Sequence, residues 1–158
     1  MLIKNITIKI IYILILIYLF IFIPSLFGYK PLVVISDSMN PTLKVGGILY
    51  YHKLDINNFN KDDILVYQSK DHIISHRIVN VTETGFITKG DANNSIDFGE
   101  VNNNQVLGKG TNWCIPYIGY YADFIYTHKH YLYIGIFLLI IDMLIDYHKK
   151  RVDIIEKT

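Results

Sequence analysis

The chain has 158 residues, a formal net charge of +1 and a single cysteine, Cys114. This length suits one small domain with one or two membrane segments. The near-neutral charge excludes the broad basic field with which proteins attract nucleic acid. A lone cysteine excludes an internal disulfide, and the sequence contains neither a Cys/His cluster typical of zinc sites nor a glycine-rich phosphate loop. We therefore expect no metal and no cofactor.

The first predicted element is an uncharged apolar run over residues 10–29, which follows Lys4 and Lys9. The run is about as long as a helix needs to cross the hydrocarbon of a bilayer. It could be a cleaved signal peptide or a retained anchor. Its apolar core is long for a signal peptide, and residues 24–28 offer no clean pair of small residues at the usual cleavage spacing. We expect a membrane anchor over residues 1–29.

The next part of the chain, residues 30–127, alternates short apolar runs with turn-forming residues. The runs are rich in β-branched and aromatic residues, and they occupy residues 32–36, 48–52, 63–68, 78–83, 85–90 and 106–110. Glycine pairs and Asn-rich stretches separate them. This spacing is typical of an all-β domain built from short strands.

The last part, residues 128–158, is apolar again. An uncharged core lies within residues 131–145, which as a helix would span about 22 Å, less than a full bilayer crossing. An amphipathic helix lying on the membrane or on the domain is one interpretation. A basic group at residues 148–151 and tyrosines at 131 and 133 favour a second, tilted span. With one span or two, the excess of lysine near the termini predicts that the β domain lies outside the cytoplasm.

Three polar motifs follow one another within the predicted β domain. They are Ser-Asp-Ser-Met-Asn-Pro at 36–41, Ser-His-Arg-Ile-Val at 75–79 and Lys-Gly-Asp-Ala-Asn-Asn-Ser-Ile-Asp at 89–97. Each alone is weak, since a serine after a strand is usually a turn residue and an aspartate in an Asn-rich stretch is usually a loop residue. Together they supply a hydroxyl, an imidazole and carboxylates, the groups of a serine hydrolase.

These motifs and their order resemble the type I signal peptidases, in particular the archaeal and endoplasmic-reticulum branch. The resemblance covers the whole chain, including the run at 115–120 before the C-terminal helix. It implies a mainly β, signal-peptidase-like catalytic domain with an N-terminal and a C-terminal transmembrane helix. It also implies a membrane-bound serine endopeptidase that removes N-terminal signal peptides after small residues. Preproteins, the lipid bilayer and the protein translocation channel are the candidate partners, in a cell membrane or a reticulum-type membrane.

The resemblance also assigns roles to individual residues. It implies Ser38 as the nucleophile and His76 as its base, where bacterial relatives carry a lysine before the arginine of this motif. Both Asp91 and Asp97 matter by the same resemblance, with Asp97 as the triad member and Asp91 as an essential supporting residue. The residues alone leave that choice open. The Ser36 hydroxyl and the Ser38 backbone N–H are the candidate oxyanion donors.

The substrate is expected to bind as an added strand. Residues 32–36 and 63–68 are the predicted walls, and small pockets between them would select Ala-like side chains.

Two other functions fit part of the pattern. A self-cleaving repressor-type Ser/Lys protease would share the β fold, but it lacks a membrane anchor and uses a different base. Lys53, Lys61 and Lys70 lie outside the matching motifs and are not assigned as bases. A non-catalytic anchored β domain is the second alternative. It would not explain why all four candidate residues are present, which are Ser38, His76, Asp91 and Asp97.

Overall fold

The computed structural model describes the backbone of residues 2–155 and the side chains of residues 6–149, 151, 152 and 155. The side chains of Lys4 and Lys150, which belong to the two predicted basic ends, lie outside the described residues. The chain forms two compact units. One comprises residues 20–123, and the other contains the described helical residues 2–19 and 124–155. The domain boundaries inferred from the sequence, at 29/30 and 127/128, remain predictions.

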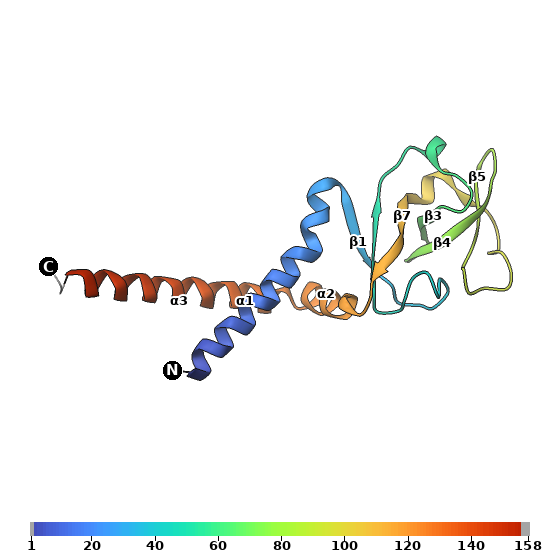
Figure 1. The fold of residues 1–158 in the computed structure, drawn as a ribbon. Coiled ribbons are helices and arrows are strands. Elements are labelled where there is room, and N and C mark those ends of the chain that lie inside the picture. The colour runs from blue at the N-terminus through green and yellow to red at the C-terminus, as the bar shows by residue number, and fades with distance from the viewer. Residues whose placement is uncertain (1, 156–158) are drawn as a thin grey trace. The chain divides into compact units, whose positions relative to one another are not determined.

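Figure 1 shows the elements in chain order. The helices are α1 (Leu2–Phe22), η1 (Ile23–Phe27), η2 (Ile56–Asn58), η3 (Asn103–Gln105), α2 (Ile118–Thr127) and α3 (Lys129–Ile155). The strands are β1 (Tyr29–Val33), β2 (Ile48–His52), β3 (Ile64–Ser69), β4 (His72–Val81), β5 (Gly85–Lys89), β6 (Val101–Asn102) and β7 (Val106–Ile115). All six predicted β runs contain or overlap a strand.

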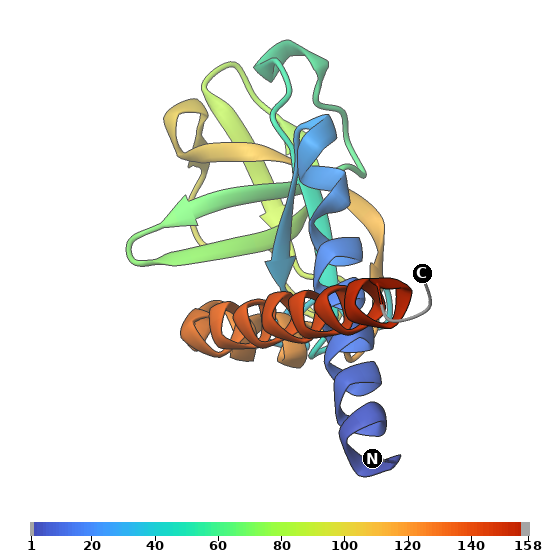
Figure 2. The same cartoon turned by 90° about the vertical axis from the view of Figure 1, so that its left-hand side faces the viewer.

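The strands form one antiparallel sheet of seven, in the order β1-β2-β7-β3-β4-β5-β6. The sheet is strongly twisted, and the β3–β4 hairpin projects from it in Figure 2. The expected mainly β fold with an apolar helix at each end is therefore confirmed.

Side chains on the two faces of the sheet enter two separate cores, because successive residues of a strand point to opposite faces. Ile64 and Val66 of β3 join a core with Val34, Met39, Leu43 and Leu49. Leu65 and Tyr67 of the same strand join the other, with Phe59, Ile78, Phe86 and Val101. Burying one such aliphatic or aromatic side chain stabilises a fold by about 1.5–3 kcal/mol. β3 is therefore the central strand from which both cores are built.

Several strand boundaries differ from the sequence-based prediction, and those of β1 and β4 bear on the site. The run predicted as a strand at 32–36 begins earlier, at Tyr29, and leaves the sheet after Val33. The strand that carries the second motif begins at His72 rather than at residue 78, which places His76 in the interior of β4. The N-terminal helix ends at Phe22, because a 3₁₀ turn with Pro24 in its first positions and Gly28 at φ 83° follows it.

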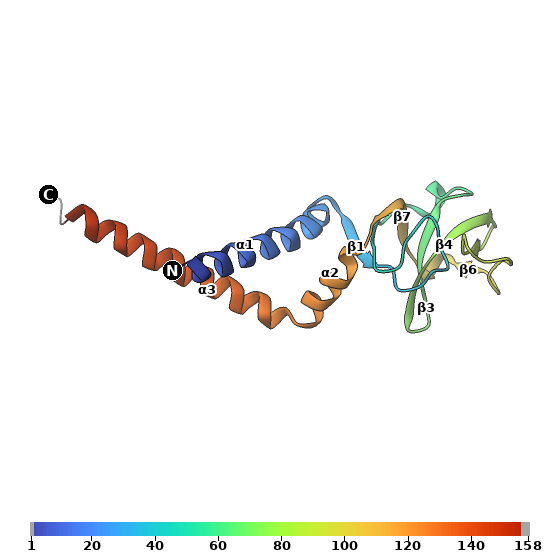
Figure 3. The same cartoon turned by 60° about the horizontal axis from the view of Figure 1, so that its bottom comes forward.

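The helical unit is built from two long apolar helices, the first of which continues into residue 20 and beyond, in the other unit. Residues 6–27 and 129–149 are long and apolar enough to cross a membrane by length and composition, with mean hydropathies of 2.8 and 1.5. Helix α3 has 27 residues and is thus longer than the predicted segment 131–145. Gly135 of α3 lies against Ile11 of α1, since an added Cβ there would be 3.6 Å from Ile11 Cγ2. Figure 3 shows α1 and α3 close together in the same region.

Candidate active site

Ser38 lies in a turn that two buried side chains hold in place. The turn follows β1 and is closed by the Asn40 N–H, which donates to the Asp37 carbonyl at 2.9 Å. Met39 and Leu43 are fully buried, and their main chains are joined by a bond from the Leu43 N–H to the Met39 carbonyl. Ser38 itself is only half-buried. Burial of its neighbour therefore fixes the position of a hydroxyl that solvent can still reach.

His76 is the side chain that meets this hydroxyl. It lies in β4 opposite Leu65 of β3 and is 9% exposed. Its Nε2 is 3.1 Å from Ser38 Oγ. Among the described residues, the hydrogen-bond partners of Ser38 Oγ are His76 and Ser36, and no lysine amine is one of them. The geometry therefore joins the predicted nucleophile to an imidazole.

Asp97 lies on the other side of the imidazole ring. Its Oδ2 is 2.5 Å from His76 Nδ1 and also accepts a bond of 2.7 Å from the Thr88 hydroxyl. The loop that carries Asp97 returns to the end of β5, where the Asp97 N–H donates to the Thr88 carbonyl at 2.8 Å. An ionised carboxylate only accepts hydrogen bonds. Nδ1 therefore carries the proton, which leaves the Nε2 lone pair directed at Ser38.

Asp91 is paired with a different partner. Arg77 Nε and Nη2 donate to its two carboxylate oxygens at 2.7 and 2.6 Å, and the Thr42 hydroxyl donates to it at 2.5 Å. These hydrogen bonds, foremost those from Arg77, hold the pKa of Asp91 below its usual value. The same pairing raises the pKa of Arg77. The structure thus separates the two aspartates that the sequence left open, because Asp97 contacts the imidazole and Asp91 contacts the guanidinium.

The loop from residue 90 to 97 reaches the serine turn through main-chain contact. The Ala92 N–H donates to the Ser38 carbonyl at 2.8 Å. Gly90 makes this approach possible, since a Cβ at that position would lie 2.6 Å from the Ser38 carbonyl oxygen. The glycine of the third motif therefore brings the two loops together.

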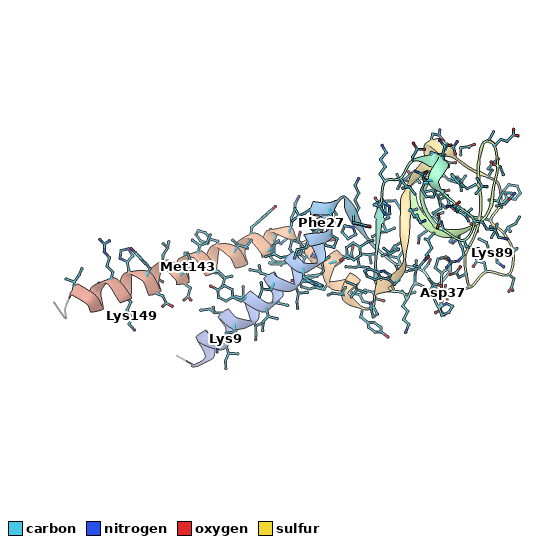
Figure 4. The ribbon with its side chains drawn as sticks, turned by 45° about the horizontal axis from the view of Figure 1, so that its top comes forward. Lys9, Phe27, Asp37, Lys89, Met143 and Lys149 are labelled. Carbon is cyan, nitrogen blue, oxygen red and sulfur yellow. The ribbon has the colours of Figure 1, made fainter. Side chains whose placement is uncertain are left out.

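Ser36 lies beside the nucleophile, with its Oγ 3.2 Å from Ser38 Oγ. Asp37 between them is exposed, and Figure 4 shows it at the same end of the β unit as Lys89. Because the Ser38 proton is directed at His76, the Ser36 hydroxyl is left to donate to Ser38 Oγ. The Ser36 hydroxyl, the predicted oxyanion donor, is therefore within hydrogen-bond distance of Ser38 Oγ, the predicted nucleophile.

A groove of about 290 Å³ leads to Ser38 and His76. Its walls are residues 32–36 on one side and 72–76 on the other, with Met39 between them. The second wall is β4 and not residues 63–68, so the sequence-based prediction of that wall was wrong. Residues 64–69 form β3, which pairs with β4 and with β7 and therefore has main-chain groups committed on both sides.

Several contact residues carried no signal in the sequence. Thr42, Thr88 and Tyr67 contact the site or stand behind it, but none belongs to the three motifs. Arg77 does belong to a motif, although the motif alone gave no role for it. Thr88 directly precedes the third motif in the sequence, which is the one feature that could have drawn attention to it.

A comparison with known proteins agrees with the motif resemblance. The chain is 31% identical over 99 residues to signal peptidase I W of Bacillus subtilis (strain 168). The match covers 59% of this chain and 52% of the relative, so the chain matches about half the length of that curated protein. No protein-family model matches the chain. The relative is named a signal peptidase, which is the kind of enzyme that the motif resemblance implies.

Proposed function

We propose that the chain is a membrane-bound serine endopeptidase that removes N-terminal signal peptides from preproteins, in the Ser-His-Asp form of the archaeal and endoplasmic-reticulum branch. One observation carries the proposal: His76 bridges Ser38 Oγ at 3.1 Å and Asp97 Oδ2 at 2.5 Å. A serine hydroxyl is a weak nucleophile until an adjacent base takes its proton. An imidazole oriented by a carboxylate supplies that base near neutral pH.

Acylation follows from this arrangement. Ser38 Oγ attacks the scissile carbonyl carbon while its proton passes to His76 Nε2, and the carbonyl oxygen takes the negative charge. The carboxylate of Asp97 stabilises the imidazolium that forms. When the carbon–nitrogen bond breaks, His76 returns the proton to the leaving amine of the mature protein. The signal peptide is left as an ester on Ser38.

Deacylation uses the same groups in reverse order. A water molecule attacks the ester carbonyl, and its proton passes to His76 Nε2. Ser38 Oγ then leaves and recovers that proton, which releases the signal peptide with a new carboxylate. In both steps the oxyanion requires donors already in position, and we assign this role to the Ser38 N–H and the Ser36 hydroxyl.

The groove suits an extended substrate. β1 is an edge strand, so one of its sides is unpaired. β5 pairs with β4 only from Arg77 onward, so residues 72–76 of β4 are also unpaired on the side of β5. Each wall of the groove therefore has main-chain groups that no neighbouring strand occupies. An extended chain adds to such an edge by main-chain hydrogen bonds. The volume of about 290 Å³ is small for a peptide segment, which favours small side chains before the cut.

The proposal places the catalytic unit on the extracytoplasmic side of a cell membrane or a reticulum-type membrane. Its support is the pair of helices with the length and composition of membrane spans, together with the lysines near the chain ends. Preproteins and the bilayer are then the partners, and the translocation channel that delivers preproteins is a further candidate partner.

The test is a cleavage assay with purified enzyme in detergent and one preprotein. Ser38→Ala should abolish cleavage while the thermal unfolding curve stays that of the wild type. Ser95→Ala is the matched control, because Ser95 is an exposed serine in the loop that carries Asp97. Normal turnover by Ser38→Ala would show that the proposed nucleophile is wrong.

A further inference from the structure

A buried pair of hydroxyl groups stands behind the triad. Thr88 is fully buried and Tyr67 is 5% exposed. The Thr88 hydroxyl is 2.7 Å from Asp97 Oδ2, and the Tyr67 hydroxyl is 3.4 Å from Thr88 Oγ1. The contacts therefore continue from Ser38 through His76 and Asp97 into the core of the β unit.

The register of the sheet explains why these residues meet. Tyr67 lies opposite Ile74, and Thr88 lies opposite Ile78. Residues 74, 76 and 78 of β4 share one face, so their partners on β3 and β5 share it too. Tyr67 and Thr88 thus come from β3 and β5, the two strands that flank His76 in β4. Their side chains lie on the same face of the sheet, where Thr88 contacts Asp97.

The directions of the hydrogen bonds follow from the chemistry of the groups. A carboxylate can only accept, so Thr88 must donate its one proton to Asp97. The Thr88 oxygen is then free to accept, and Tyr67 must be the donor in the bond between the two hydroxyls. The chain of donors therefore runs from Tyr67 to Thr88 to Asp97, and each hydroxyl increases the polarity of the next.

Packing alone does not account for these hydroxyls. The face that holds them is lined by Leu65, Ile78 and Phe86, where valine and phenylalanine would fill the same space. Burying a hydroxyl without a partner costs free energy, and a partnered one gains only modestly. Burial also raises the pKa of Tyr67, with a further contribution from the nearby charge of Asp97, so the phenol stays protonated and able to donate.

We propose that Thr88, supported by Tyr67, is a positioning residue that fixes the Asp97 carboxylate for its contact with His76. The inference rests on the proposed function. Asp97 belongs to the loop of residues 90–97, whereas Thr88 belongs to β5 within the sheet. Thr88 and His76 both bond to Asp97 Oδ2. Because Thr88 is held in the sheet, its hydrogen bond restricts the motion of the Asp97 carboxylate in the loop. Without that bond the carboxylate can rotate, and His76 loses its orientation toward Ser38.

The test compares Thr88→Val, Thr88→Ser and Tyr67→Phe by steady-state cleavage of one preprotein. Thr88→Val keeps the shape but removes the donor, so kcat should fall about tenfold to a hundredfold while KM changes little. Thr88→Ser restores the donor and should recover kcat to within about threefold of the wild type. Tyr67→Phe should lower kcat by a smaller factor, about twofold to fivefold.

Thr111→Val is the matched control, because the Thr111 hydroxyl in β7 donates to the Trp113 carbonyl and has no contact with the triad. It should leave kcat unchanged. Thermal unfolding of every variant checks the fold. If Thr88→Val does not fold, Tyr67→Phe carries the test, since it removes one oxygen and leaves the contact between Thr88 and Asp97 in place.

A second readout does not depend on cleavage. A proton held between His76 Nδ1 and Asp97 should give a low-field NMR signal in the wild type, in Thr88→Ser and in Thr111→Val, and should be lost or broadened in folded Thr88→Val. Wild-type kcat together with an unchanged signal in folded Thr88→Val would overturn the inference. A wild type that cuts no preprotein would overturn the proposed function, and the positioning role would still be supported if the signal is present in the wild type and lost in folded Thr88→Val.

Discussion

Asp91 and Asp97 belong to one motif and one loop, but their partners differ in kind. Asp91 holds a permanent cation, since Arg77 binds both of its oxygens. Asp97 holds an imidazole and a neutral hydroxyl. A guanidinium remains charged at every stage of a reaction, whereas an imidazole gains and loses its charge. The comparison teaches that the partner, and not the motif position, distinguishes a carboxylate that binds a permanent cation from one that binds a group able to change its charge.

The geometry of β4 produces this difference. His76 and Arg77 are successive residues of the strand, so their side chains leave it on opposite sides. One side leads to Ser38 and Asp97, and the other leads to Asp91 and Thr42. His76 and Arg77 therefore hold the loop of residues 90–97 at two points, His76 at Asp97 and Arg77 at Asp91.

Among changes to the two aspartates, the largest expected effect comes from Asp97→Asn. An amide is nearly the same size as the carboxylate, but it cannot stabilise the imidazolium and can favour the wrong tautomer of His76. We expect kcat to fall on the order of 10³- to 10⁴-fold, with the unfolding temperature close to that of the wild type. Steady-state cleavage of a preprotein measures this. A loss of less than about tenfold would mean that Asp97 does not orient His76.

A smaller effect on activity and a larger effect on stability are expected for Asp91→Asn. This change leaves Arg77 without its bidentate partner, and we expect the free energy of unfolding to drop by about 2–3 kcal/mol. Denaturant unfolding measures it.

Arg77→Gln serves as the paired control for Asp91→Asn. If the ion pair is the cause, the double variant should lose much less stability than the sum of the two single changes. Additive losses would show that the two side chains act separately.

The smallest effect is a dependence on pH. The pKa of Asp91 is lower in the folded protein than its ordinary value, because Arg77 and Thr42 donate to its charged form. A depressed pKa contributes stability that is fully present above the unfolded value of about 4 and is lost as pH falls through the folded value. The stability difference between the wild type and Asp91→Asn should therefore be constant near neutral pH and shrink below about pH 4. A difference that persists to lower pH would contradict this assignment.

Much of the fold could be predicted from the sequence, because short β-branched runs between glycine and asparagine turns are local signals of an all-β domain. The candidate site was predicted from the family resemblance of the three motifs, since the residues alone left the choice between Asp91 and Asp97 open. The role of Thr88 could not be predicted, since a threonine that donates to a carboxylate has the same strand pattern as one that only packs. The second groove wall depends on which strands are neighbours, and strand order is set by long-range packing.

The extent of α3 was missed for a different reason. The apolar run gives the length of a possible membrane segment, but a helix does not end where polarity begins. Residues such as Lys149 and Arg151 are good helix formers, and no glycine or proline follows Gly135 within the described part of the helix. Hydropathy therefore marks the part of a helix that lipid could accommodate, and helix propensity determines where the helix stops.

The free strand edges on both sides of the groove carry a consequence for the proposed substrates. A helical segment has already satisfied its amide and carbonyl groups internally, so it has little to offer to either edge. Such a segment must unwind before it can lie between residues 32–36 and 72–76. Preproteins with glycine or proline a few residues before the scissile bond should therefore be processed faster than those whose leader remains coiled up to the cut.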